Sequence, residues 1–184
     1  MSQVWLIRHA TSIAPQGVAI GATNPPLDEG GLAQAQVVAD ALAGRPLSMI
    51  LSSDMERALA TARILAGPHR LIVQATPDLR EIDFGSWEGR RLGELWSEDP
   101  PSARAWELDI RSAPSSFGET VADLERRVAH FWQRLQPLPR AGEIAIVGHR
   151  GSLATLSALI SGRTLAEAFS MRFEPGGVIG LTVG

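Results

Sequence analysis

Residues 4–12 read VWLIRHATS, and residues 144–152 read IAIVGHRGS. In each stretch a short, continuously apolar run stops abruptly at a histidine beside an arginine, and small residues follow. An apolar run without alternation is typical of a parallel strand that is covered on both faces of its sheet. Because strands usually give way to turn residues, the repeated pair indicates that two strand ends carry chemistry to one place.

Three further apolar runs predict strands, and helical patterns lie between them. This alternation favours an α/β fold, a three-layer sandwich in which helices flank a mostly parallel central sheet. The patterns predict strands at 4–7, 47–51, 71–73, 144–147 and 178–183, and helices at 31–43, 54–66, 120–135 and 152–160. The second helix is expected to be capped by Ser53 or Asp54 and to stop at the Gly-Pro pair 67–68.

The length of 184 residues predicts a single domain, 1–184. Within it, residues 81–116 have no strand signal and hold three of the five tryptophans. We expect them to form a lid-like insertion of loops and short helices that covers the substrate at the C-terminal edge of the sheet.

The composition excludes several classes of chemistry. The chain has no cysteine, which excludes disulfides, thiol catalysis and cysteine-based zinc sites. All 17 of its Lys and Arg residues are arginine, which excludes a P-loop lysine and Schiff-base chemistry. The net charge of −3 gives no overall positive field, so no nucleic-acid partner is expected. Neither a signal-peptide core nor a membrane span of roughly 20 apolar residues is present, so we expect a cytoplasmic protein without a membrane partner.

The cationic residues at the strand ends predict an anion site. Ligands of open α/β sheets bind beyond the carboxyl ends of the strands. Two neighbouring parallel strands would bring Arg8, His9, His149 and Arg150 to that edge, and Arg57 lies near the start of a helix that reaches it. Arginine pairs with phosphate oxygens through parallel N–H donors. A phosphate is therefore the expected ligand, and a carboxylate is the weaker alternative because its two oxygens would be outnumbered by donors.

A pair of histidines in such a site suggests a reaction as well as binding. A neutral imidazole can attack phosphorus and form a phosphohistidine, while the cations stabilise the charge on the transferring group. The leaving oxygen then needs a proton donor, and Glu81 is a candidate because neighbouring aromatic residues would raise its pKa. Asp83 and Glu88 are rivals by position. No metal-binding motif is present, so neither a metal nor another cofactor is expected.

Four segments in order resemble the histidine phosphatase superfamily, also called the phosphoglycerate mutase-like family. LIRHATS at 6–12 is similar to its LIRHGET-type opening, and LSSDMERALATA at 51–62 to its SSxxxRAxxTA segment. LREIDFGSWEG at 79–89 and VGHRGSL at 147–153 resemble its third and fourth segments. The resemblance implies His9 as nucleophile, Arg8 and Arg57 as phosphate ligands, Glu81 as proton donor and acceptor, and His149 as a second catalytic histidine.

The chain also departs from this pattern. Ala10 replaces a glycine, Thr11 stands where Glu, Gln or Asp is common, and Arg150 replaces a small residue. We count Thr11, Arg150 and Gly151 among the expected substrate-binding residues, Arg150 as an extra cation that could reach a second acidic group. The segment 14–31 is most similar to the α-ribazole phosphatase branch, with Asn24 in place of its usual aspartate.

Most other notable residues have an ordinary structural explanation. Trp5, Trp106 and Trp132 are expected to pack in the interior, whereas Trp87 is a candidate wall of the substrate pocket. The charged run 125–127 is expected to be a solvated helix face, and His69 and His130 to face solvent.

The expected function is that of a metal-independent phosphomonoesterase acting on a small metabolite such as α-ribazole 5′-phosphate, its small-molecule partner. The alternatives are a phosphoglycerate mutase-type phosphomutase, a broad-specificity phosphatase and a catalytically silent phosphate-binding domain. A homodimer is a possible assembly.

Overall fold

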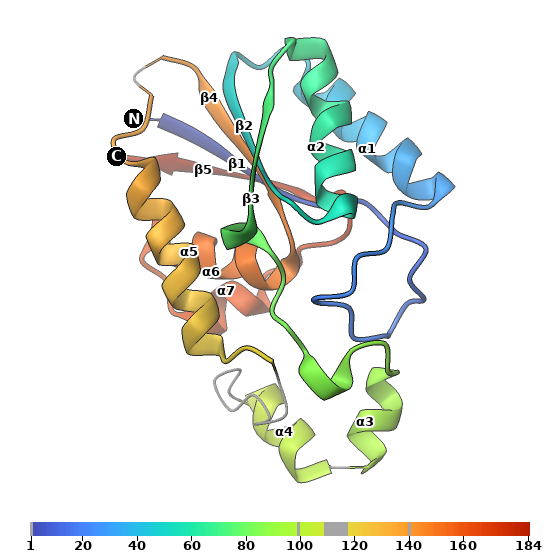
Figure 1. Cartoon of the computed structure of the whole chain (residues 1–184). Coiled ribbons are helices and arrows are strands. Elements are labelled where there is room, and N and C mark those ends of the chain that lie inside the picture. The colour runs from blue at the N-terminus through green and yellow to red at the C-terminus, as the bar shows by residue number, and fades with distance from the viewer. Residues whose placement is uncertain (1, 99, 109–117, 140) are drawn as a thin grey trace.

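The central sheet has five strands in the order β3-β2-β4-β1-β5 (Figure 1). A computed structural model describes residues 2–98, 100–108, 118–139 and 141–184. The strands are β1 (Ser2–Arg8), β2 (Leu47–Ser53), β3 (Val73–Thr76), β4 (Glu143–Gly148) and β5 (Val178–Val183). β1, β2, β3 and β4 run parallel, and β5 lies antiparallel to β1 at the edge. The mostly parallel α/β fold expected from the apolar runs is confirmed.

Seven α-helices occur among the described residues, and the longer ones cover the two faces of the sheet (Figure 1). Two short 3₁₀ turns at Pro77–Leu79 and Gly85–Trp87 follow β3. The helices are α1 (Glu29–Leu42), α2 (Glu56–His69), α3 (Leu92–Glu98), α4 (Pro100–Leu108), α5 (Val121–Leu135), α6 (Arg150–Ser161) and α7 (Leu165–Ser170).

Each inner strand contributes apolar side chains to a core on both of its faces. Leu6 and Ile146 pack in a cluster with α5, α6 and α7. Ile7 and Val147, the next residues along each strand, pack in a second cluster with α1 and α2. Successive side chains of a strand point to opposite faces, so continuous apolar runs are needed where both faces are buried.

Several predicted boundaries were wrong. The third strand begins at Val73, where the prediction ended it, and α7 carries a capping box that the patterns did not reveal. The helix α2 passes through Pro68 and ends where Arg70 adopts φ 55° and its N–H bonds to the carbonyls of Ala66 and Gly67. Proline near a helix end removes only one hydrogen bond, so it need not stop the helix there.

The expected cap of α2 was also wrong. Neither Ser53 nor Asp54 occupies the N-cap position, which belongs to Met55 and has no side-chain hydrogen bond of its own. The side-chain oxygen of Asn24 instead accepts from the Glu56 N–H at 2.7 Å, so a distant loop satisfies the helix terminus. Asp54 pairs with Arg80 on the surface.

The segment expected to be an insertion forms a small aromatic cluster away from the main core. Trp87 and Leu95 are buried against Ala19, and Phe84, Trp96 and Trp106 pack around them. In Figure 1, α3 and α4 lie at the end of the molecule opposite the chain termini. Residues 99 and 109–116 of the expected segment lie outside the described residues.

None of the helices in the described part of the chain is both long enough and apolar enough to span a bilayer.

Candidate active site

The two histidines meet because β1 and β4 are adjacent and in register. Arg8 lies opposite Gly148, so each strand places its histidine one residue beyond the same point. The His9 N–H donates to the Gly148 carbonyl at 2.9 Å, and the centroids of the His9 and His149 rings are 4.9 Å apart. The parallel pairing of β1 and β4 thereby brings together residues that are far apart in the sequence.

His9 is held as a neutral imidazole with one defined tautomer. Its Nδ1 lies 2.7 Å from the Ala10 carbonyl oxygen, which can only accept, so Nδ1 carries the hydrogen. The Arg57 Nε–H points at the opposite nitrogen, Nε2, at 3.4 Å. Burial, followed by the charge of Arg57, lowers the pKa of His9 to about 3. Nε2 therefore carries no proton at neutral pH, as nucleophilic attack requires, and its lone pair accepts a long hydrogen bond from Arg57.

Arg57 is held rigidly although it lies near the start of a helix. Its side chain is buried, and Nη1 and Nη2 donate to the carbonyls of Thr23 and Gly21 at 2.8 and 3.2 Å. The loop that supplies these carbonyls is fixed in turn by Glu88, which accepts from the backbone N–H groups of residues 21–23. Burial raises the pKa of the Glu88 carboxyl, but hydrogen bonds from Thr23 and several backbone amides outweigh it and lower the pKa. Glu88 is thus ionised and serves this loop, which removes it as a rival proton donor.

Two buried nitrogens beside His9 have no hydrogen-bond partner in the described part of the chain. They are Nε of Arg8 and Nδ1 of His149. The Arg8 side chain is oriented by its Nη1, which donates to the Phe173 carbonyl at 2.7 Å. Nε2 of His149 lies 3.0 Å from Ser53 Oγ, and burial lowers the pKa of His149 well below its usual value. Leaving a buried donor unpaired costs about 1–3 kcal/mol, and an anion with several acceptor oxygens would remove that cost.

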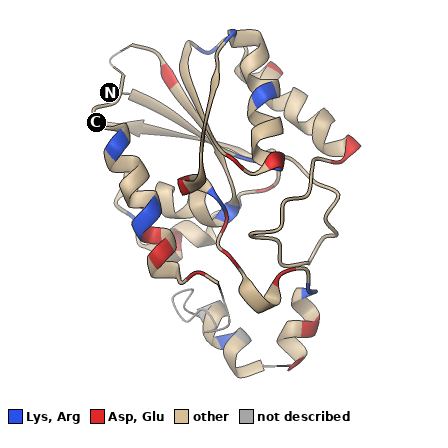
Figure 2. Ribbon diagram, viewed as in Figure 1, with Lys and Arg blue, Asp and Glu red and all other residues tan. Residues whose placement is uncertain are grey.

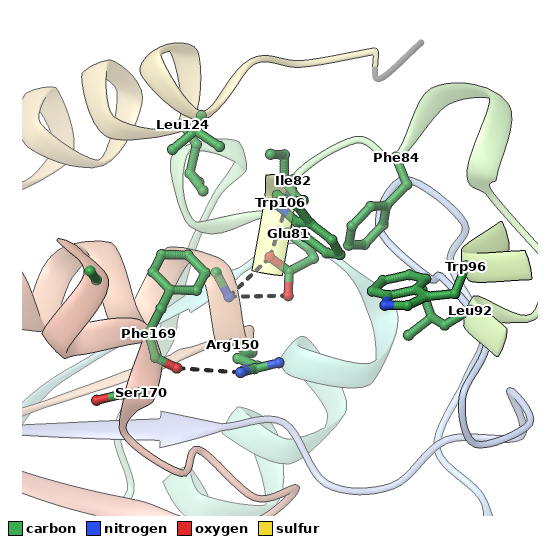
Figure 3. Close-up of a pocket in the computed structure, with 13 residues that line it drawn as sticks. Glu81, Ile82, Phe84, Leu92, Trp96, Trp106, Leu124, Arg150, Phe169 and Ser170 are labelled. Carbon is green, nitrogen blue, oxygen red and sulfur yellow. Dashed lines mark hydrogen bonds between the residues drawn. The ribbon is translucent and has the colours of Figure 1, made fainter. Parts of the chain in front are cut away.

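Glu81 stands between two cavities. It lines a cavity of about 730 Å³ together with Arg8, His9 and Arg57, and also a second cavity of about 440 Å³. The N–H groups of Ile82 and Gly151 each lie 3.0 Å from its Oε1 and fix the carboxyl group (Figure 3). Asp83, the other rival, accepts from the Gly85 N–H and is absent from the lining of both cavities.

The backbone before Glu81 is fixed by Arg127, a residue that the sequence analysis placed on a solvated helix face. That expectation was wrong for this residue. The Arg127 guanidinium donates to the carbonyls of Asp78, Arg80 and Glu81 at 2.7–3.0 Å and pairs with the Glu119 carboxylate. In Figure 2, blue and red bands lie side by side on α5. The position of Arg127 next to the apolar stripe of α5 was the signal that could have revealed it.

The second cavity is apolar and aromatic (Figure 3). Phe84, Trp96, Trp106 and Phe169 supply aromatic side chains to its wall. Trp87, the expected wall, is absent from the lining of both cavities and is buried with its ring 5.7 Å from Trp96 and 5.9 Å from Trp106. We expected Trp106 to pack in the interior and Trp87 to line the pocket. The structure shows the reverse, because the turn at Gly85–Trp87 points Trp87 inward.

The three remaining expected ligands lie in different places. Thr11 lines the His9 cavity, where its Oγ1 donates to Asp28 and its N–H donates to Gln34. Arg150 and Gly151 line the aromatic cavity instead. A Cβ atom at Gly151 would lie 2.2 Å from the Glu81 Oε1, so any larger residue here would displace the Glu81 carboxyl group. His130 is exposed as expected, whereas His69 is half-buried.

The arrangement places the neutral imidazole of His9, the guanidinium groups of Arg8 and Arg57 and the carboxyl group of Glu81 around one cavity. No group of three or more metal-ligating side chains suited to a metal ion occurs among the described residues.

Several known proteins are similar to this chain in sequence. The model of the histidine phosphatase superfamily (branch 1) matches residues 4–184. An adenosylcobalamin/alpha-ribazole phosphatase of Escherichia coli (strain K12) is 34% identical over 175 residues, which cover 95% of this chain and 86% of the relative. A probable phosphoglycerate mutase of Yersinia pestis (strain Pestoides F) is 29% identical over 163 residues, covering 88% of this chain and 76% of the relative.

Solved structures give the same result. The crystal structure of the alpha-ribazole phosphatase from Shigella flexneri has a TM-score of 0.87 at 32% identity and covers 99% of this chain and 91% of that one. A mycobacterial glucosyl-3-phosphoglycerate phosphatase in complex with inorganic phosphate has a TM-score of 0.88 at 26% identity, covering 99% and 90%.

Proposed function

Because this chain belongs to the histidine phosphatase superfamily and is a phosphatase, we propose that it hydrolyses phosphomonoesters through a phosphohistidine at His9. Nε2 of His9 attacks phosphorus, so an N–P bond forms as the bond from phosphorus to the ester oxygen breaks. The Arg8 and Arg57 guanidinium groups stabilise the charge on the transferring group. His149, with a neutral ring beside His9, contacts the same phosphoryl group.

Glu81 supplies and recovers the proton in this proposal. In its protonated form it donates to the ester oxygen, and the alcohol leaves with that proton. A water molecule then attacks the phosphorus atom, Glu81 accepts its proton, and the N–P bond breaks to release phosphate. The reaction returns His9 and Glu81 to their starting states, and the cations that it needs come from the chain itself.

The leaving alcohol is expected to carry a flat, apolar group. This expectation rests on Glu81, which lines both the His9 cavity and the aromatic cavity. A phosphoryl group at His9 would therefore leave the alcohol facing Phe84, Trp96 and Trp106. The names of the relatives suggest α-ribazole 5′-phosphate, whose benzimidazole ring suits an aromatic wall, as the first candidate substrate.

The first test is hydrolysis of an aryl phosphate in excess EDTA by the native protein and by His9→Ala. We expect metal-independent turnover that falls at least about 10³-fold in the variant, because a nucleophile cannot be replaced by binding groups. His130→Ala is the matched control, since His130 is an exposed histidine on α5. Retained turnover in His9→Ala would contradict the phosphohistidine route.

A substrate panel then separates the remaining alternatives. It compares α-ribazole 5′-phosphate with 3-phosphoglycerate, the latter with and without a bisphosphate primer. Preferred hydrolysis of α-ribazole 5′-phosphate supports the proposal. Primer-dependent transfer without hydrolysis would instead indicate a mutase, and phosphate binding without any turnover would indicate a silent binding domain.

A further inference from the structure

Arg150 is a charged residue in the wall of an apolar cavity, and it lacks a charged partner. It is the first residue of α6, directly after His149, and its side chain is exposed. Its Nη2 donates to the Phe169 carbonyl at 3.3 Å, and it takes part in none of the ion pairs found among the described residues. Most of the donors of this guanidinium group therefore face the cavity or solvent rather than a carboxylate.

Neither structural support nor anion binding explains this placement well. The single 3.3 Å hydrogen bond from Arg150 to the Phe169 carbonyl contributes little to the stability of the fold. An anion held beside Arg150 would enter a cavity whose other side chains are apolar or aromatic except for Glu81 and Ser170. Glu81 would repel the anion whenever it is ionised, and Ser170 offers only one hydroxyl donor. Anion sites in proteins usually converge several donors, and this wall does not.

A flat aromatic ring suits the same surroundings much better. The planar guanidinium group is weakly hydrated and stacks on aromatic faces. Figure 3 draws the Arg150 side chain between Phe169 on one side and Trp96 with Leu92 on the other. A ring that enters this cavity would thus meet the guanidinium on one face and apolar side chains around the rest of its surface.

We propose that Arg150 is a specificity-determining residue that stacks on the aromatic ring of the leaving alcohol. The inference rests on the proposed phosphatase function and deepens it by naming the feature of the substrate that is recognised. Arg150 selects phosphomonoesters whose alcohol carries a ring over those whose alcohol lacks one. Arg150 lines the aromatic cavity and not the His9 cavity, although its charge acts on Arg8, so we expect it to contact the ring rather than the phosphoryl group.

The test uses two substrates that differ only by the ring. α-Ribazole 5′-phosphate and ribose 5-phosphate share the same primary alcohol and phosphate, so the ratio of their kcat/KM values measures the contribution of the ring. We expect Arg150→Gln to reduce this ratio by about 2- to 30-fold, the range of a cation–π contact, with little change for ribose 5-phosphate. Arg150→Lys should recover only part of the loss, since an ammonium group cannot stack as a plane.

Arg63→Gln is the control for loss of an arginine charge. Arg63 is an exposed arginine on α2 and lines a separate surface cavity between α2 and β3. Arg63→Gln should leave the ratio of the two kcat/KM values unchanged. A second readout avoids turnover of the ring-bearing ester: unphosphorylated α-ribazole should inhibit ribose 5-phosphate hydrolysis, and its inhibition constant should rise in Arg150→Gln by the same factor.

Each other outcome overturns the inference in a recognisable way. An equal loss for both substrates would show that Arg150 acts on the phosphate site, and no loss would show that it contacts neither. A selective loss for 3-phosphoglycerate that Arg150→Lys fully restores would identify an anion as the ligand. If the native protein itself shows no preference for the ring-bearing substrate, the proposed substrate class fails, whereas an intact preference unaffected by Arg150→Gln refutes the stacking alone.

Discussion

At the scale of single residues, the site depends on groups whose protonation is set by burial. His9 and His149 are both buried and neutral, and their nearest charged neighbours are arginines that disfavour a second positive charge. A neutral His9 is useful for attack on phosphorus, but it makes the fold sensitive to acid. The unfolded chain binds a proton at each histidine near pH 6.5, whereas the folded chain does not.

Stability is therefore expected to fall as the pH drops from 6.5 towards 3. In this window the unfolded state binds more protons than the folded state, so the free energy of unfolding rises with pH. Urea unfolding at pH 4.5 to 6.5 measures this slope above the range where most carboxylates titrate. The variant His9→Gln should have a shallower slope than the native protein, and His130→Gln should not. Equal slopes in all three proteins would contradict the lowered pKa of His9.

Gly151 gives a second prediction at this scale. A methyl group at this position would lie 2.2 Å from Glu81 Oε1, so Gly151→Ala must displace the proposed proton donor. We expect kcat for an alkyl phosphate to fall by about 10²-fold or more, as for loss of a general acid. The rate for p-nitrophenyl phosphate should fall much less, because p-nitrophenolate leaves without a proton. Gly93→Ala is the control, since nothing lies within 4 Å of its added Cβ.

At the scale of elements, α5 shows how a helix on the outer layer reaches the site. Its Arg127 donates to three carbonyls of the segment that leads into Glu81, while the neighbouring Arg126 points outward with 74% of its side chain exposed. Of these two adjacent arginines, Arg127 is partly buried and hydrogen-bonded to backbone, whereas Arg126 is solvated.

Arg127→Gln is expected to lower the free energy of unfolding by about 1–3 kcal/mol, because three carbonyl groups, two of them partly buried, lose a charged donor. It should also lower kcat for alkyl phosphates more than for p-nitrophenyl phosphate, since it loosens the backbone that carries Glu81. Denaturant titration and the two rate assays measure these effects, with Arg126→Gln as the matched control. If both variants behave alike, Arg127 does not position the proton donor.

The elements also show where sequence patterns succeed. The long apolar runs of β1 and β4 predicted their strands and the meeting of the two histidines, because both faces of an inner strand must be apolar. The partner of the α2 N-terminus could not be predicted. The Glu56 N–H donates to Asn24, which lies on the loop before α1 and is separated from α2 in the sequence by α1 and β2. Trp87 and Trp106 were ranked wrongly, because a local turn decides which indole is buried and which lines the cavity.

At the scale of the whole molecule, a phosphate ligand should stabilise the folded chain. It would pair with Arg8 and His149, each of which has one buried ring or guanidinium nitrogen, Nε of Arg8 and Nδ1 of His149, without a partner among the described residues. At a phosphate concentration of 100 times Kd the gain is about 2.7 kcal/mol, which raises the Tm of a domain of this size by about 5–10 °C. Calorimetry of the native protein and of Arg8→Gln, each with phosphate and with chloride, measures the shift. A shift of the same size in Arg8→Gln would place the anion elsewhere.

The order of the strands has a consequence for how the molecule is made. β1 pairs only with β4 and β5, which lie in the last quarter of the chain, while β2 pairs with β3 and β4. On the ribosome the first strand must wait until these late segments emerge, and its apolar side chains stay without their sheet neighbours in the meantime. A nascent chain that ends before residue 143 can pair β2 with β3, yet it has nothing to receive β1. His9, the proposed nucleophile, is therefore synthesised early and reaches its final position late. Activity is expected to return on refolding only when β1 has paired with β4, which joins the two ends of the sequence.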